Sequence, residues 1–370
     1  MELMEDTSSV ERVIMEKSKA TGTPVYGCLE LTPLCNMNCE MCYVRLDHRE
    51  MQRQGRLRTG KEWLEVGNQM QQSGTLFVLL TGGEPLLHPD FQEIYLGLRN
   101  LGMILTINTN GTLLDEKWAD FFALYPPRRI NITLYGKDAE AYQSLCHYTE
   151  GYNKAICAVQ LLVNRGVDVK INVSAARANA DDIDKIIALE EQLGVPVRVD
   201  AYMMPAVRER NKPYDMQSRL TPTEAARVQF ESLRQEMGPH LFEQYVIQAL
   251  NRVEEFVPSD KPRKMTCYAG NSSFTINWQG NLRPCVVMSS PTANVFEHGF
   301  LSAWKAVHSE SQKIRLNLKC SQCSLGSLCR TCAASAILET GEYQGIPEYM
   351  CSYAKETYRL LRLEKECCHD

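Results

Sequence analysis

Three cysteines lie close together near the start of the chain, in the segment L-T-P-L-C-N-M-N-C-E-M-C-Y-V (31–44). Their spacing, C-x3-C-x2-C, places Cys35, Cys39 and Cys42 on a loop directly after an apolar, strand-like run. A structural zinc site normally closes with four ligands, so zinc would need a distant residue such as His48. A [4Fe–4S] cluster has four irons, and three thiolates leave one iron open for a small ligand. The spacing favours an iron–sulfur site over zinc.

A second motif, T-G-G-E-P (81–85), follows the next apolar run. Its two glycines, Gly82 and Gly83, allow a backbone to approach a ligand closely, and Glu84 can accept hydrogen bonds from an ammonium group. A Gly-Gly-Glu-Pro turn alone is often no more than a tight turn. At the end of the second strand, however, it faces the cysteine loop at the end of the first, which makes a functional role the better interpretation.

The elements that must position these motifs form a regular alternation. The chain has 370 residues, 44% of them hydrophobic, enough for one barrel-sized domain and a smaller one. Apolar runs predict strands at 25–32, 75–81, 103–109, 129–135, 167–174 and 195–202. Helical patterns lie between or after them at 59–73, 89–101, 115–124, 138–146, 152–165 and 180–193. Six strand–helix units predict an α/β fold with a parallel sheet, a partial (β/α)6 barrel with its site at the C-terminal ends of the strands.

The composition changes after Pro205. A polar linker leads to a helix expected at 221–256, which Thr221 and Pro222 begin. The region after it is rich in cysteine. We therefore expect four segments: an N-terminal extension (1–24), the partial barrel (25–205), a linker and helical bridge (206–264), and a smaller cysteine-rich domain (265–370).

Charge and composition exclude several classes of protein. The net charge is -5, and no basic run is dense enough for a nucleic-acid surface. No apolar stretch is long enough to span a membrane, and the acidic N-terminus does not read as a signal peptide. We therefore expect a cytoplasmic protein without nucleic-acid or membrane partners. In a reducing compartment, its 15 cysteines point to metal binding or catalysis, whereas the isolated Cys28, Cys146 and Cys157 are expected to be small hydrophobic residues.

Together the two motifs resemble those of the radical S-adenosylmethionine (SAM) enzymes, whose hallmark is C-x3-C-x-Φ-C followed by Gly-Gly-Glu-Pro on a partial (β/α)6 barrel similar to a TIM barrel. The resemblance implies that the three cysteines hold a [4Fe–4S] cluster and that the segment Gly82, Gly83, Glu84 holds the ammonium of SAM. Reductive cleavage of SAM would then give a 5′-deoxyadenosyl radical that abstracts a substrate hydrogen atom. The aromatic Φ position is Met41 here, so Tyr43 or Met41 itself would pack on the adenine.

The resemblance implies further cofactor contacts where three later strands end. The candidates are Asn108 in N-T-N-G-T, Thr133 in T-L-Y-G, and Asn172 with Ser174 at the end of the fifth strand. For each of them, a polar residue that simply bonds to backbone is the alternative interpretation.

The C-terminal cysteines form a second pattern. Cys267 and Cys285 occur as C-x12-G-x4-C, followed by C-x2-C-x5-C-x2-C at 320–332 and by Cys351. A zinc ribbon would use the 320–332 block alone. The whole array instead resembles the SPASM domain, which carries two auxiliary iron–sulfur clusters, expected here as [4Fe–4S], although one residue fewer precedes Cys332 than in the family pattern. The resemblance assigns the ligands in two sets: Cys267, Cys285 and Cys332 for the first auxiliary cluster, and Cys320, Cys323, Cys329 and Cys351 for the second.

The first of these sets lacks a fourth cysteine, since none lies between 267 and 285. Two explanations are open. A group from the tail Cys367-Cys368-His369 closes the cluster, or one iron stays open and binds a substrate thiolate.

SPASM-type enzymes mostly modify peptides and proteins, so the resemblance implies a ribosomally made peptide as substrate. The outcome would be a thioether or other crosslink, or an epimerisation with a hydrogen donor such as Cys146 or Cys157. The implied partners are the peptide or protein substrate, an electron donor such as flavodoxin or ferredoxin, and a separate peptide-recognition protein, because only about 24 residues precede the first strand.

Three alternatives remain. Sulfatase-maturating enzymes, which form formylglycine, carry an Asp directly after the second cysteine of the first auxiliary pair, where this chain has Val286. A small molecule such as a tetrapyrrole or a sugar is a second alternative substrate. A non-enzymatic metal scaffold would leave the Gly-Gly-Glu-Pro turn without a use.

Overall fold

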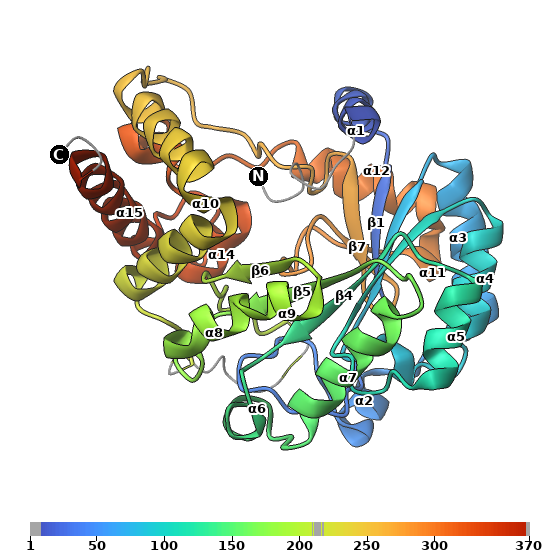
Figure 1. Cartoon of the computed structure of the whole chain (residues 1–370). Helices are drawn as coiled ribbons and strands as arrows, with labels where there is room; N and C mark the ends of the chain where they lie inside the picture. The colour runs from blue at the N-terminus through green and yellow to red at the C-terminus, as the bar shows by residue number, and fades with distance from the viewer. Residues whose placement is uncertain (1–8, 209, 211–215, 217, 368–370) are drawn as a thin grey trace.

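The protein is built around one strongly curved sheet of nine strands, seen in a computed structural model (Figure 1). The structure describes residues 9–208, 210, 216 and 218–367. The strand order is β6-β5-β4-β3-β2-β1-β7-β8-β9. Strands β1 to β6 pair in parallel with their neighbours in chain order, as in a partial barrel.

All six predicted strands form, and each lies within its predicted range. They are β1 (Tyr26–Glu30), β2 (Phe77–Thr81), β3 (Ile104–Thr109), β4 (Arg129–Leu134), β5 (Val169–Ser174) and β6 (Val197–Asp200). The two motif loops follow β1 and β2. These strands pair in register, with Glu30 opposite Thr81, so the cysteine loop and the Gly-Gly-Glu-Pro turn leave the sheet side by side.

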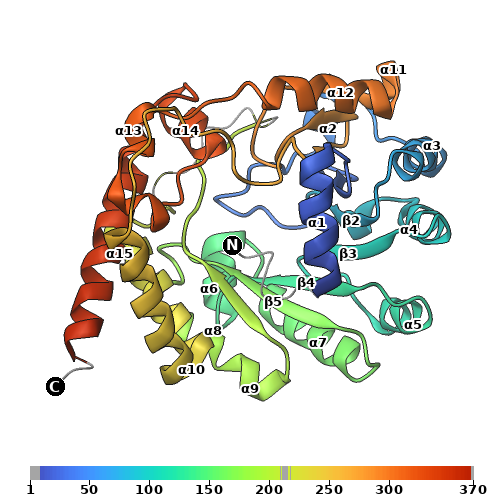
Figure 2. The same cartoon turned by 90° about the horizontal axis from the view of Figure 1, so that it is seen from above.

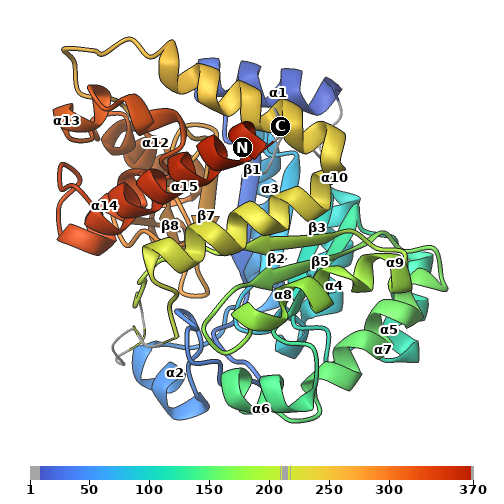
Figure 3. The ribbon, with the colours of Figure 1, turned by 60° about the vertical axis from the view of Figure 1, so that its left-hand side comes forward.

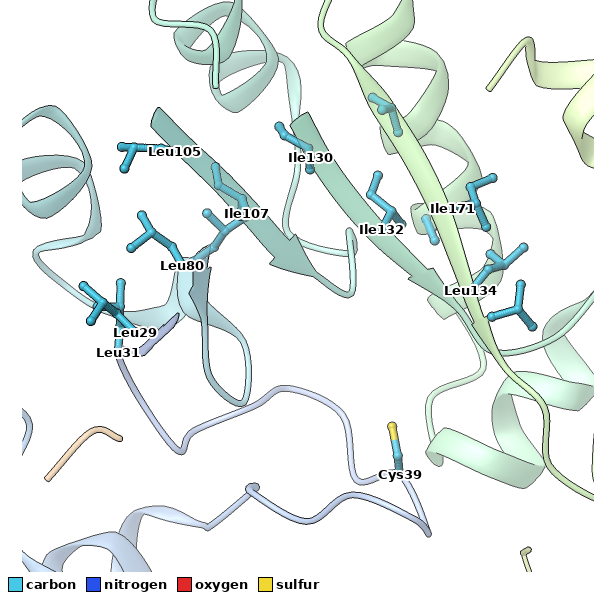
Figure 4. Packing of buried hydrophobic residues seen from close by; sticks show 14 of the residues in the cluster. Leu29, Leu31, Cys39, Leu80, Leu105, Ile107, Ile130, Ile132, Leu134 and Ile171 are labelled. Carbon is cyan, nitrogen blue, oxygen red and sulfur yellow. The ribbon is translucent and has the colours of Figure 1, made fainter. Parts of the chain in front are cut away.

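Helices cover the outer face of the parallel strands (Figure 2). They are α3 (Gly60–Gln72), α4 (Phe91–Asn100), α5 (Glu116–Leu124), α6 (Ala139–Cys146), α7 (Gly151–Val163), α8 (Ile183–Ile187) and α9 (Leu189–Leu193). The side chains at alternate strand positions, such as Ile107, Ile132 and Ile171, are almost fully buried in the main hydrophobic core (Figure 4). Because strand side chains alternate, the intervening polar residues line the inner face of the barrel.

Local sequence signals account for several helix ends. Capping boxes begin α2 (His48–Gln54) with Asp47 and α3 with Thr59, where the side chain of the third helical residue returns a hydrogen bond to the cap. Asp90 directly precedes α4, but its carboxylate does not cap that helix and instead accepts a hydrogen bond of 2.8 Å from the backbone N–H of Gly60. It therefore joins the starts of α3 and α4.

The helix predicted at 180–193 is not continuous in the structure. The range 180–193 divides into a 3₁₀ turn (Ala180–Asp182) followed by α8 and α9, which Ala188 separates. The Asn179 side chain explains where the turn begins, because it accepts a hydrogen bond from the N–H of Ala176 and donates to the carbonyl groups of Tyr135 and Ser174. These bonds hold the end of β5 and leave no continuous helix before the 3₁₀ turn.

The C-terminal region extends the barrel sheet. Strand β7 (Ser273–Ile276) pairs in parallel with β1, and β8 (Asn281–Arg283) and β9 (Ala293–Asn294) follow it in antiparallel order. The remaining helices of this region are α11 (Val295–His298), α12 (Phe300–Ser311), α13 (Leu318–Ser321), α14 (Ala333–Thr340) and α15 (Glu348–Cys367). The cysteines at 267 and 285 thus flank strands that are continuous with β1.

A long helix, α10 (Pro222–Glu254), connects the barrel to this region and packs along α15 (Figure 3). It begins at Thr221, whose capping box with Glu224 confirms the predicted start, and it bends at Gly238, where φ is 69°. The helix α1 (Ser9–Thr21) precedes β1, near the N-terminal ends of the strands. No helix in the described part of the chain has the length and apolar character needed to cross a membrane.

Candidate active site and cluster-binding cysteines

The cysteine loop leaves β1 and passes across the C-terminal ends of the barrel strands, where Figure 4 shows Cys39. Burial, followed by the nearby Glu84 carboxyl, raises the pKa of the Cys35 thiol, and Cys39 and Cys42 raise it further. Burial and then Cys39 likewise raise the pKa of Cys42. The structure therefore brings the three predicted cysteines close enough to interact electrostatically.

This donor set suits a cluster. Among the described residues, no three His, Cys, Asp or Glu side chains are gathered tightly enough to hold one metal ion. A [4Fe–4S] cluster makes a different demand, since each thiolate binds its own iron. Three thiols on one loop meet that demand and leave one iron for a further ligand.

The glycines of the second motif have a structural role that their backbone contacts reveal. The N–H of Gly83 donates to the carbonyl of Thr32 at 2.7 Å, and the N–H of Glu84 donates to the carbonyl of Leu34 at 2.8 Å. A Cβ atom on Gly82 would lie 2.4 Å from the Thr32 carbonyl oxygen, and one on Gly83 would lie 2.4 Å from that of Leu34. Only glycine allows the two loops to run this close together.

Glu84 is completely buried and joins the ends of two strands, β2 and β3. Its carboxylate accepts hydrogen bonds from the Thr109 hydroxyl at 2.8 and 2.9 Å, from the Asn110 N–H at 2.8 Å and from the Leu86 N–H at 3.2 Å. Burial raises the pKa of the Glu84 carboxyl to about 7, against the opposing effect of the bonds from Asn110 and Thr109. The predicted ammonium-binding segment is therefore also the anchor that ties β2 to β3.

The loop after β3 in turn holds the cysteine loop. The Asn110 amide donates to the Asn36 side-chain oxygen at 2.9 Å and approaches the Cys35 sulfur at 3.7 Å. Asn36 donates to the Thr112 hydroxyl at 2.8 Å, and Thr112 donates back to the Asn110 oxygen at 2.7 Å. This closed triangle explains the N-T-N-G-T sequence as a support for the residues next to Cys35.

The predicted strand-end contacts share the inner face of the barrel. Asn108 lies opposite Asn131 in the β3–β4 register, and Thr133 lies opposite Asn172 in the β4–β5 register. Ser174 follows two residues after Asn172, on the same face. These four residues were predicted at the ends of three strands, and the sheet brings them into one polar surface.

Asn131 is a residue of this surface that the sequence analysis missed. Its amide donates to the Asn108 oxygen at 2.7 Å, and its own oxygen is buried without a hydrogen-bond partner among the described residues. A buried acceptor of this kind normally has a donor. A bound molecule with N–H or O–H groups, such as the adenosine part of SAM, would supply one. The signal in the sequence was a polar residue at an inward-facing position of an otherwise apolar strand.

Tyr43 lies at the junction with the C-terminal region. Its ring lies beneath the guanidinium of Arg208 at 5.2 Å and packs against the hydrophobic cluster that Cys285 and Cys332 also contact. Of the residues predicted to touch the cofactor, Tyr43 is the one that the structure places between the two cysteine regions.

The C-terminal cysteines approach one another in two groups. Burial is the main cause that raises the pKa of Cys285 to about 11, and Cys332 and Cys267 contribute to this rise. In the second set, Cys320 interacts electrostatically with Cys329, Cys351 and Cys323. Cysteines that are distant in sequence thus lie near one another, three in the first group and four in the second.

Of the tail residues predicted to close the set of three thiols, only the backbone of Cys367 lies in the described part of the chain. Cys368 and His369 lie outside the described residues, and Cys367 is the last residue of α15. Since α15 is a continuous helix, Cys367 lies about 24 Å along the axis from Cys351. Figure 2 shows that α15 leads away from α14, which Cys332 begins.

The two candidate hydrogen donors lie on helices that cover the sheet, Cys146 on α6 and Cys157 on α7. Cys146 is completely buried at the end of α6, where the N–H groups of Asn38 and Glu40 donate to the carbonyls of Cys146 and Leu145, and its thiol contacts Cys39. Cys157 is exposed on α7. Cys28 is buried in β1, and Cys146 likewise matches the expected small hydrophobic role, whereas the exposed Cys157 does not.

Comparison with known proteins agrees with this geometry. A model of the radical SAM superfamily matches residues 29–189, and a model of the SPASM iron–sulfur cluster-binding domain matches residues 267–333. The chain is a radical SAM enzyme with a SPASM domain. The predicted cofactors, SAM and iron–sulfur clusters, are those of these two domains, and the predicted fold is confirmed.

Relatives of this radical SAM enzyme differ in what they make. The AdoMet-dependent heme synthase of Methanosarcina barkeri is 25% identical over 340 residues, which cover 87% of this chain and 95% of that protein. AlbA of Bacillus subtilis, a biosynthesis protein of the antilisterial bacteriocin subtilosin, is 24% identical over 341 residues, which cover 90% and 71%. The structure of anSMEcpe with bound AdoMet and the Kp18Cys peptide is 18% identical and shares the fold, with a TM-score of 0.67 over 94% of this chain and 100% of that one.

Proposed function

We propose that this enzyme modifies a ribosomally made peptide by an oxidative crosslink such as a thioether. Three sites define the proposal: a radical SAM cluster on Cys35, Cys39 and Cys42, and two auxiliary clusters on the two C-terminal sets of cysteines. With SAM bound, the cofactors supply a 5′-deoxyadenosyl radical that takes a hydrogen atom from the substrate. The protein orients SAM through the Gly-Gly-Glu-Pro turn and the polar inner face, and it excludes water from the radical.

The observation that carries the crosslink is the proximity of the two cysteine regions. A thioether forms with the loss of one hydrogen from carbon and one from sulfur. After a hydrogen atom has been taken from carbon, a proton and an electron must still leave the substrate. The first auxiliary set lies against the Tyr43 end of the radical SAM loop, where Cys285, Cys332 and Tyr43 contact one hydrophobic cluster. A cluster held by Cys267, Cys285 and Cys332 would supply an acceptor for the surplus electron there.

Epimerisation has less support from the positions of the cysteines. It needs a hydrogen donor at the substrate. Cys146 is fully buried beside Cys39, and Cys157 is exposed on a helix that covers the outside of the sheet. The set of three auxiliary thiols, in contrast, leaves one iron that a substrate thiolate could bind during thioether formation.

The sulfatase-maturase alternative lacks its base at the predicted position. Val286 follows Cys285, and its carbonyl accepts a hydrogen bond from Arg208. The side chain at position 286 is therefore an aliphatic one, without the carboxylate that the base of these enzymes would supply there.

A tetrapyrrole is the second candidate substrate. The similarity to the heme synthase favours it, because that similarity extends over 95% of the heme synthase. The inner face argues for a less acidic ligand. Arg129 is paired with Asp168 and Arg198 with Glu236, and Lys170 on the same face also has partners. A substrate with several carboxylates would have to compete for these cations, whereas a peptide segment needs mainly the amide and hydroxyl groups that this surface offers.

The test is an anaerobic reaction with SAM, a strong reductant and a panel of cysteine-containing peptides. A crosslink would appear by mass spectrometry as the loss of two hydrogen atoms, with 5′-deoxyadenosine formed in parallel. The Cys39→Ala variant serves as the control and should form neither product. An isobaric peptide with an inverted residue would refute the crosslink, and turnover of a tetrapyrrole instead of every peptide would favour the second candidate.

A further inference from the structure

A buried arginine–carboxylate pair links the segment after β6 to the C-terminal end of β1. Arg208 donates through both terminal nitrogens to the two oxygens of Glu30, at 2.7 and 2.6 Å, and both side chains are at most 1% exposed. Arg208 has a φ of 49°, a sparsely populated conformation for a residue other than glycine. Such a conformation persists where surrounding contacts impose it, so this pair is held in place from several directions.

The same guanidinium touches both cysteine regions. It lies over the ring of Tyr43, the residue after Cys42, and it donates to the carbonyl of Val286, the residue after Cys285. Tyr43 and Val286 also pack against the same hydrophobic cluster. One side chain therefore bridges the immediate neighbour of a radical SAM cysteine and that of an auxiliary cysteine.

We propose that Arg208 is a positioning residue that fixes the first auxiliary site relative to the radical SAM site. The planar Arg208 guanidinium binds the Glu30 carboxylate through two N–H groups, stacks on the Tyr43 ring and donates to the Val286 carbonyl. A lysine ammonium cannot make these three contacts together. The inference rests on the proposed assignment of Cys42 and Cys285 to two clusters, and it holds for any substrate.

Replacing Arg208 alone would not separate positioning from stability. Removing one member of a buried ion pair leaves an uncompensated charge, and this alone is strongly destabilising. The double variant Glu30→Gln with Arg208→Met removes both charges at similar volume. It should restore stability relative to Arg208→Met but still lack the bridge to Val286.

The chain offers a matched control. Arg219 pairs with Glu339 of α14 and stacks on the Tyr349 ring at 3.6 Å, and both members of this pair are largely buried. The pair also joins the linker to the SPASM region, but neither member contacts a neighbour of Cys42 or Cys285. The corresponding double variant is Arg219→Met with Glu339→Gln.

The experiment measures magnetic coupling between clusters by electron paramagnetic resonance in the reconstituted, dithionite-reduced holoenzyme, with iron content and urea midpoint determined in parallel. We expect the Glu30→Gln, Arg208→Met variant to keep wild-type iron content and to lose or shift the spin-coupled features, whereas the Arg219 control keeps them. Wild-type coupling in a fully loaded Glu30→Gln, Arg208→Met variant would overturn the proposal, as would an equal change in the control. A wild type without iron at the auxiliary site would instead refute the cluster assignment.

Discussion

Replacing Gly83 with alanine tests whether the Gly-Gly-Glu-Pro turn positions the cysteine loop. The added Cβ would lie 2.4 Å from the Leu34 carbonyl oxygen and 2.7 Å from that of Pro33. An ordinary carbon–oxygen contact is about 3.4 Å, so the two backbones must separate by about 1 Å. Both neighbours are backbone atoms, which cannot rotate away as a flexible side chain would.

This separation breaks specific bonds. The hydrogen bonds from Gly83 to Thr32 and from Glu84 to Leu34, now 2.7 and 2.8 Å, would exceed the range of a hydrogen bond. Two bonds at about 1 kcal/mol each, with about 1–3 kcal/mol of overpacking, give a loss of about 3–5 kcal/mol. Because the loss falls on the contact between the motif loops, the radical SAM site should lose its iron first.

The assay is iron per chain after anaerobic reconstitution, with the free energy of unfolding in urea. We expect Gly83→Ala to bind about four irons fewer than the wild type and to form little 5′-deoxyadenosine, because one [4Fe–4S] cluster is lost. Gly326→Ala is the matched control, since the nearest heavy atom to its Cβ is 3.8 Å away, an ordinary contact. Full iron loading and wild-type stability in Gly83→Ala would refute the reasoning.

Three further predictions concern the inner face and the helical bridge. Asn131→Ala should weaken SAM binding about fivefold in equilibrium dialysis, the equivalent of about 1 kcal/mol for one hydrogen bond, and an unchanged affinity would contradict the assigned contact. The arginines Arg359 and Arg227 lower the pKa of Glu356 to about 2. The stability that this carboxylate adds is therefore fully present above the unfolded-state pKa of about 4.3, and it is lost as the pH falls through about 2. The melting temperature of Glu356→Gln should therefore approach that of the wild type as the pH is lowered from 6 toward 3, and a constant difference would refute the linkage. Gly238→Ala should lower stability by about 1–3 kcal/mol in urea because its φ of 69° strains any other residue, although the site has room for a Cβ; a stabilised variant would contradict this.

The strands could be predicted, and the cysteines could be proposed as cluster ligands, because both signals are local. Each apolar run contains enough β-branched and aliphatic residues to define a strand, and the cysteine spacings carry the two ligand patterns directly. The 3₁₀ turn that precedes α8 could not be predicted, since its start depends on Asn179 bonding to the backbone at Tyr135, far away in sequence. The pairing of β7 with β1 is also a long-range choice that no periodicity reveals.

The environment of the site was harder to predict than its residues. Glu84 was expected at the cofactor, and its burial against Thr109 and Asn110 emerges only when β2 and β3 are placed together. Tyr43 was expected near the adenine, but its contact with Arg208 depends on a linker 165 positions later. Asn131 was overlooked because one inward-facing amide means little until its neighbour Asn108 is known.

The central claim is that the three sets of cysteines each hold an iron–sulfur cluster. The most direct measurement is iron and sulfide per chain after anaerobic reconstitution, for the wild type and for the variant with Cys35, Cys39 and Cys42 all replaced by alanine. Three [4Fe–4S] clusters predict about twelve irons in the wild type and about eight in the variant. About four irons in the wild type, with zinc in the C-terminal region, would contradict the account and remove the electron acceptor on which the proposed crosslink depends.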